Sequence, residues 1–139
     1  MPPTPFSWPL RVYYEDTDAQ GVVYYANYFK FMERARTEWI RTLGIEQDAL
    51  LRDERRMFVV VGTNAGFHRP ARFNDLLHVT AALTERSRAS FSIAQRIYRG
   101  SLDGELLCSG TVRAAFLNAD TLRPAKLPDS LLRDTAYEH

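Results

Sequence analysis

The stretch that decides the fold runs from residue 28 to residue 43 and reads Tyr28-Phe29-Lys30-Phe31-Met32-Glu33-Arg34-Ala35-Arg36-Thr37-Glu38-Trp39-Ile40-Arg41-Thr42-Leu43. Its apolar side chains recur at steps of three and four, and charged side chains occupy the opposite side. This spacing predicts an amphipathic helix of roughly five turns with one buried face. Gly44 and Ile45 predict its end, with the glycine left-handed and the isoleucine folding back.

A sheet is predicted to follow this helix. From Met57 onward the apolar spacing changes to every second position, which is typical of strands. The strands are predicted at residues 57–66, 77–84, 91–98 and 105–118. The first is expected to be buried because it is rich in valine, residues 100–104 supply a hairpin turn, and Gly110 predicts a bulge or bend. One long helix before four strands predicts an α+β fold, with an antiparallel sheet wrapped on the helix.

Shorter elements complete the chain. They are predicted as an extended, proline-rich arm at 1–9, a strand at 10–14, a helix at 46–54, an exit from the sheet at 124–129 and a helix at 130–135. No repeat or linker interrupts the pattern, so residues 1–139 are expected to form a single domain.

Composition excludes several functions. The 18 basic and 17 acidic residues leave a formal net charge of +1, which gives no reason to expect a nucleic-acid partner. No apolar run is long enough to span a membrane, and the first nine residues do not resemble a signal peptide. The one cysteine, Cys108, favours a reducing compartment and is expected to be a small buried side chain. A cytoplasmic protein is therefore expected.

The residues before the long helix carry the candidate chemistry. Asp16 and Asp18 precede a turn at Gly21, and the helix follows within a few residues. The first N–H groups of a helix lack acceptors and carry a partial positive charge. A carboxylate beside them stays ionised, and the N–H groups can stabilise an oxygen that becomes negative. This arrangement suits hydrolysis of an activated carbonyl without a metal or a cofactor.

A family resemblance rests on the same segment. Tyr14, Asp16-Thr17-Asp18, Gly21, Val23-Tyr24 and Tyr28, followed by Glu33-Arg34-Ala35-Arg36, resemble the 4-hydroxybenzoyl-CoA thioesterase family of hotdog-fold proteins. Within that family the chain is most similar to the acyl-CoA thioesterases associated with the bacterial Tol–Pal system. The similarity extends from Phe6-x-Trp8-Pro9 to Pro124-x-x-Leu127-Pro128. It implies the hotdog fold, dimers that assemble into tetramers, and hydrolysis of an acyl-CoA to free acid and coenzyme A.

The resemblance also implies site residues. Asp18 corresponds to the catalytic carboxylate, acting as nucleophile or general base, and the backbone N–H of Tyr25 to the oxyanion donor. Free aspartate, with a pKa of about 3.9, is a weak base at neutral pH, which favours direct attack. Close relatives carry histidine at the position of Tyr25, so their Tyr–Asp–His set becomes Tyr14, Asp18 and Tyr25. Arg88 corresponds to a basic turn position that meets coenzyme A phosphates.

Each candidate also has a purely structural interpretation. Asp18 could be a turn or capping carboxylate, and Asp16 is expected to be one. Tyr14 could orient Asp18 through its hydroxyl or pack in the core. Asn27 is expected to cap the helix or to hydrogen-bond near the site, where Gly21 shapes the substrate-binding turn. Arg88 could be a solvated turn residue.

The residues also bear on other functions. A calcium loop is disfavoured because Asn27 stands where a bidentate glutamate is needed, and the histidine spacing predicts no metal site. A non-catalytic module that binds acyl-CoA or acyl-carrier protein stays open as the alternative to the enzyme. Acyl-CoA is the expected partner and acyl-carrier protein a further candidate. A homodimer is expected because edge strands seek partners.

Overall fold

The computed structural model describes residues 6–133. Its elements, in chain order, are β1 (Phe6–Arg11), a short 3-10 turn (Tyr14–Asp16), α1 (Asn27–Thr42), α2 (Gln47–Glu54), β2 (Arg56–Phe67), β3 (Leu76–Arg86), β4 (Ser90–Arg99), β5 (Leu106–Asn118) and α3 (Asp129–Arg133). The predicted long helix and the four strands after it are confirmed. The arm at residues 1–5 and the end of the last predicted helix, residues 134–135, lie outside the described residues.

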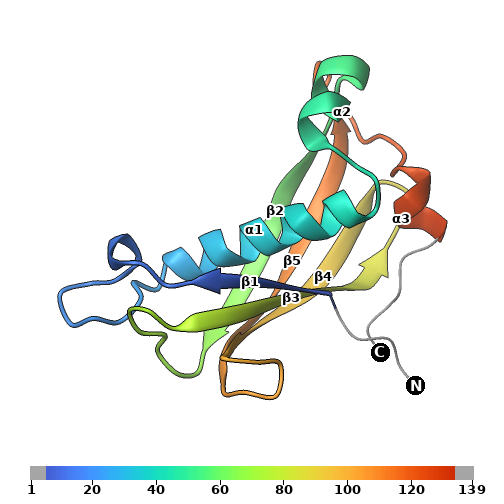
Figure 1. Cartoon of the computed structure of the whole chain (residues 1–139). Coiled ribbons are helices and arrows are strands. Elements are labelled where there is room, and N and C mark those ends of the chain that lie inside the picture. The colour runs from blue at the N-terminus through green and yellow to red at the C-terminus, as the bar shows by residue number, and fades with distance from the viewer. Residues whose placement is uncertain (1–5, 134–139) are drawn as a thin grey trace.

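The five strands form one antiparallel sheet in the order β1-β3-β4-β5-β2, and the sheet curves around α1 (Figure 1). The apolar stripe of α1 faces the sheet, and it buries Tyr28, Phe31, Met32, Ala35, Trp39 and Ile40. These side chains belong to two core clusters, one at each end of the helix. The α+β fold with a sheet wrapped on a central helix is therefore confirmed.

The middle of α1 is tied to the sheet by a buried polar side chain. Gln95 of β4 has no exposed surface, and its Nε2 donates to the carbonyls of Met32 at 2.9 Å and Thr80 at 3.2 Å. Its Oε1 accepts a hydrogen bond from Arg36 at 3.1 Å. Since an unpaired buried amide is costly, these bonds fix the depth of α1 over the strands.

The first strand lies earlier than the spacing at 10–14 predicted. It pairs Phe6–Arg11 with β3, and Tyr14 starts the 3-10 turn instead. Residues 6–9 of the predicted extended arm are paired as part of β1, which is an edge strand, where a proline without an N–H such as Pro9 is tolerated.

The valine-rich strand β2 is also an edge strand, so the expectation that it is buried was wrong. Val60 and Val61 are 52% and 57% exposed, and the register shifts between Val60 and Gly62. Valine content predicts a strand, but it does not say whether a second strand lies beyond it.

The expected end of the long helix is confirmed at Gly44, which has a φ of +82° while its N–H bonds to the carbonyl of Arg41. Ile45 is buried behind it. Gly110, by contrast, does not form the expected bulge. It pairs in register with Ala65 on one side and Gln95 on the other, and a Cβ there would lie 2.3 Å from the carbonyl oxygen of Asn64.

We therefore expect Gly110→Ala to destabilise the protein by about 2 kcal/mol, because a backbone atom must move to admit the methyl group. Gly62→Ala, in the neighbouring strand, is the matched control, since a Cβ there meets nothing within 4 Å. Urea unfolding of both variants measures the difference. Equal stability of the two variants would contradict this reason for the glycine.

Candidate functional site

The loop between β1 and α1 folds into a small hairpin around Asp18. Thr17 and Val23 form an antiparallel bridge, and the N–H of Asp18 donates to the carbonyl of Val22 at 2.9 Å. The N–H of Gly21 donates to the carbonyl of Asp18 at 3.0 Å, and Gly21 has a φ of +79°. A residue with a Cβ would be strained at that φ, which explains the glycine in the predicted turn.

The Asp18 carboxylate is exposed and is oriented by backbone groups. Its Oδ1 accepts the N–H of Gln20 at 2.8 Å and that of Val22 at 3.4 Å. The turn interpretation of Asp18 is therefore confirmed, and its other carboxylate oxygen makes no hydrogen bond to the described residues. A carboxylate that is both fixed and exposed can also react with a ligand.

Asp16 is the turn acid that the sequence predicted. It is buried, and its Oδ2 accepts the N–H of Tyr13 at 2.9 Å. Its carbonyl accepts the N–H of Tyr24 at 3.0 Å and the Nδ2 of Asn27 at 2.9 Å. Asn27 is the first residue of α1 and not its cap, so the capping interpretation was wrong. Its side chain ties the start of the helix to the loop.

Two backbone N–H groups of the described residues are unpaired where this loop leads into α1. Among residues 6–133, the N–H groups of Tyr25 and Ala26 have no hydrogen-bond acceptor, whereas that of Asn27 donates to the carbonyl of Tyr24 at 2.9 Å. The predicted donor at Tyr25 is thus unpaired, and it lies two residues before the first residue of α1. Ala26 was not predicted, although unpaired N–H groups are common to all helix starts.

Tyr14 is neither in the core nor bonded to Asp18. It is 77% exposed, and its ring stacks on Phe73 with centroids 4.0 Å apart and planes at 14°. Within the part of the chain that the structure describes, no hydrogen bond joins its hydroxyl to Asp18. The core interpretation was wrong because the 3-10 turn points this side chain outward.

The loop between β2 and β3 is hydrogen-bonded to the hairpin around Asp18 and to α1. The carbonyl of Ala71 accepts the N–H of Val23 at 2.8 Å, and its N–H donates to the Tyr28 hydroxyl at 2.9 Å. Burial raises the pKa of Tyr28, so this hydroxyl stays neutral. Phe73 donates its N–H to the carbonyl of Gly21 at 3.2 Å. Pro70-Ala71-Arg72 of this loop belongs to the family resemblance, but its pairing with the hairpin around Asp18 has no local signal in the sequence.

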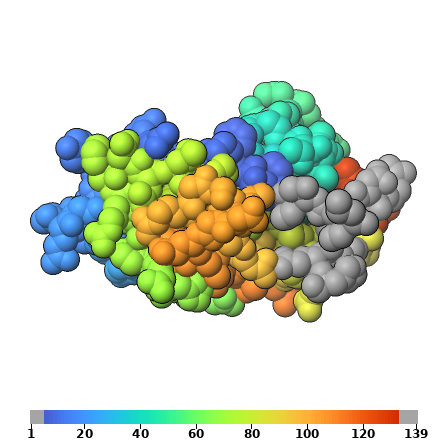
Figure 2. Space-filling model, turned by 60° about the horizontal axis from the view of Figure 1, so that its bottom comes forward, coloured from blue at the N-terminus to red at the C-terminus, as the bar shows by residue number. Residues whose placement is uncertain are grey.

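Arg99 of β4 anchors the same loop. Its guanidinium forms an ion pair with Asp75, donates to the carbonyl of Pro70 at 2.9 Å, and reaches Glu105 at 3.1 Å. Figure 2 shows the loop (green) between the residues before α1 (blue) and the hairpin that joins β4 to β5 (orange). The contacts of Arg99 therefore fix the loop that is hydrogen-bonded to the turn around Asp18.

Aromatic side chains adjoin the free donors. Phe67, at the end of β2, is 48% exposed, and its ring centroid lies 6.1 Å from that of Tyr25 and 5.5 Å from that of Tyr28. Phe29 of α1 is 6.3 Å away. Phe67 was not among the predicted site residues, because strict alternation from Phe58 would place it on the other face, and only the register shift between Val60 and Gly62 turns it to the helix side of the sheet.

Arg88 lies away from the other candidates. It is exposed in the turn between β3 and β4, and its carbonyl accepts the N–H of Leu127 at 2.8 Å, just before α3. This turn lies at the C-terminal end of α1, whereas Asp18 lies at the N-terminal end (Figure 1). The helix is about 24 Å long, so one chain does not bring Arg88 and Asp18 together.

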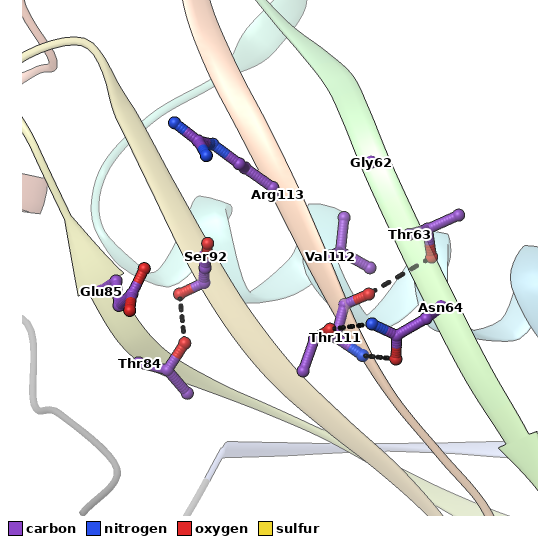
Figure 3. Close-up of a pocket in the computed structure, with 9 residues that line it drawn as sticks. All are labelled: Gly62, Thr63, Asn64, Thr84, Glu85, Ser92, Thr111, Val112 and Arg113. Carbon is purple, nitrogen blue, oxygen red and sulfur yellow. Dashed lines mark hydrogen bonds between the residues drawn. The ribbon is translucent and has the colours of Figure 1, made fainter.

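A separate polar depression lies on the face of the sheet turned away from α1 (Figure 3). It measures about 390 Å³ and is lined by Gly62, Thr63, Asn64, Thr84, Glu85, Ser92, Thr111, Val112 and Arg113. It includes none of the residues predicted for the site. Its residues come from β2, β3, β4 and β5, and the loop before α1 contributes nothing to it.

Other chemistries find little support. The described residues hold no group of three His, Cys, Asp or Glu side chains that could bind a metal ion. Cys108 is buried, as expected, and burial raises its pKa to about 11, so it is a poor nucleophile at neutral pH. In the range 6–133 no helix is long and apolar enough to cross a membrane.

Comparison with known proteins gives consistent matches. Residues 12–134 match the model of the family described as the thioesterase-like superfamily. The chain is 40% identical to the acyl-CoA thioesterase YbgC of Haemophilus influenzae over 134 residues, which cover 96% of this chain and 95% of that protein. It is 34% identical to the Helicobacter pylori protein of the same name over 124 residues, 85% of this chain and 90% of the other.

A solved structure agrees with these matches. A probable thioesterase from Bartonella henselae superposes with a TM-score of 0.82 at 33% sequence identity, covering 90% of this chain and 100% of the other. The hotdog fold expected from the resemblance is thereby confirmed.

Proposed function

Because the chain belongs to the thioesterase-like superfamily, we propose that it hydrolyses the thioester of an acyl-CoA to a free acid and coenzyme A. The observation that carries the proposal is that the hairpin with the exposed Asp18 belongs to the loop leading into α1, where the Tyr25 and Ala26 N–H groups are unpaired among the described residues. A carboxylate and free donors at one loop are what acyl transfer from sulfur requires.

The reaction follows from these groups. The carbonyl oxygen of the thioester accepts the Tyr25 N–H, which stabilises the negative charge that develops there. In direct attack, a carboxylate oxygen of Asp18 bonds to the acyl carbon, the C–S bond breaks, and the thiolate leaves and is protonated by water. Water then hydrolyses the acyl anhydride. In the alternative route Asp18 removes a proton from the attacking water and the thiolate takes a proton in turn.

The other predicted residues have supporting roles in this proposal. Gly21 permits the turn that presents Asp18, and Asn27 fixes that turn to the helix start through the carbonyl of Asp16. Tyr14 stacks with Phe73 on the same loops and flanks the substrate.

We also propose that the chain forms a homodimer through its β2 edges, with two dimers forming a tetramer. The exposed Val60 and Val61 on an edge strand favour such pairing. Only a second copy could bring Arg88 to coenzyme A phosphates bound near Asp18. Sedimentation of the wild type as a monomer would contradict this assembly. A cytoplasmic location, acyl-carrier protein as a second acyl donor, and a link to the Tol–Pal system belong to the same proposal.

The test is a thiol-release assay of the wild type with acetyl-, hexanoyl-, benzoyl- and palmitoyl-CoA. At least one substrate is expected to release coenzyme A with turnover above the rate in buffer. Tight binding of an acyl-CoA without release of any thiol would instead support a non-catalytic binding module. Neither binding nor release would overturn both functions.

A further inference from the structure

Phe67 occupies a distinctive position at the edge of the candidate site. It is the last residue of β2, and in the register it opposes the buried Cys108 of β5, which places its side chain on the helix side of the sheet. About half of its surface is nevertheless exposed. A large apolar side chain on the core side of a sheet usually becomes buried, so this exposed ring is unusual.

Phe67 contacts the start of α1 with only part of its ring. Its ring meets Tyr25 and Phe29 edge-on, with interplanar angles of 75° and 85°, and it is tilted at 50° to Tyr28. These three residues belong to the start of α1 or to the turn that precedes it. The ring therefore packs by part of its surface against the helix start and leaves the rest open beside it.

The position of the free donor connects Phe67 to the substrate. The unpaired N–H of Tyr25 belongs to the residue whose ring Phe67 contacts. A thioester whose carbonyl oxygen accepts a hydrogen bond from that N–H would therefore bind at a residue whose own ring belongs to this cluster. The cluster offers apolar surface and no charge, so it suits a hydrocarbon group better than a small or charged one.

We infer that Phe67 selects the acyl group and that the substrate class is acyl-CoAs with an apolar body of several carbons. This inference rests on the proposed function. A hexanoyl chain offers several methylene groups for contact with the ring, whereas an acetyl group offers a single methyl group. The contacts that the longer acyl group makes with Phe67 in the transition state then raise kcat/KM for that substrate.

The experiment compares kcat/KM for hexanoyl-CoA and acetyl-CoA in the wild type, Phe67→Ala and Phe67→Val. The wild type is expected to favour hexanoyl-CoA, and both variants are expected to lower the hexanoyl-to-acetyl ratio by about tenfold, as for loss of several buried methylene contacts. Leu51→Ala on α2, also an exposed apolar residue, is the matched control and should leave the ratio unchanged. Melting curves confirm folding, and two substitutions of different size guard against one that fails to fold.

The outcomes separate this inference from the proposed function. If the wild type cleaves neither thioester nor any other acyl-CoA, the proposed function fails. If the wild type cleaves both at measurable rates but prefers acetyl-CoA, or if a folded Phe67 variant keeps the wild-type ratio, acyl selection by Phe67 is wrong while the enzyme assignment stands.

Discussion

Asp18→Asn is expected to lower kcat for acyl-CoA hydrolysis by about 10³-fold and to leave the fold intact. Asparagine keeps the side-chain oxygen that accepts the N–H groups of Gln20 and Val22, so the turn is preserved. It loses the negative charge, so it can neither attack the acyl carbon nor take a proton from water. The assay is release of free thiol at saturating substrate, with a melting curve beside it.

Glu15→Gln is the matched control for this substitution. Glu15 is an exposed acid three residues earlier in the same loop, and its carboxylate makes no hydrogen bond or ion pair to residues 6–133. The same loss of one negative charge there should change kcat by no more than about twofold, because surface charges are strongly screened. Equal losses in both variants would show that the net charge of the loop matters and not the Asp18 group.

Tyr25→Pro is expected to have the second largest effect, a loss of about 10² in kcat, because proline removes the backbone N–H proposed to bind the oxyanion. Proline is tolerated before a helix, and the Tyr25 N–H makes no bond within the described structure that would be lost. The measurement is kcat and KM for the best acyl-CoA.

Tyr25→Ala separates the backbone from the side chain. Alanine removes the ring that contacts Tyr24 and Phe67 but keeps the N–H. The alanine variant should retain at least ten times the kcat of the proline variant. If both lose activity equally and both remain folded, the phenol ring is the important group and the oxyanion assignment is wrong.

The secure parts of the fold could be predicted because their signals are local. The three-and-four spacing from Tyr28 to Leu43 and the glycine at position 44 give α1 almost to the residue. The edges of the sheet could not be predicted in this way. Whether β2 is covered depends on strands elsewhere in the chain or on another copy, and the sequence of β2 itself carries no such information.

The residues of the candidate site also divide into those that a local sequence pattern predicts and those that only the fold brings there. Asp18, Gly21 and the Tyr25 N–H lie within one short segment, so a motif can identify them together. Ala71 and the ring of Phe67 contact that segment or the helix after it from about forty residues further along the chain, and only the folded sheet places them there. Arg88 is the opposite case. The family resemblance assigns it to the site, but within one chain its turn lies at the other end of α1 from Asp18.

The most direct test is the amide spectrum of ¹⁵N-labelled wild type titrated with a hexanoyl thioether analogue of acyl-CoA, which cannot be hydrolysed. The largest changes in chemical shift are expected at the amides of Tyr25 and Ala26, with those of Gln20 and Val22 next because they donate to the Asp18 carboxylate. Shifts concentrated at Thr111 and Arg113, in the depression of Figure 3, with Tyr25 unchanged, would contradict this expectation.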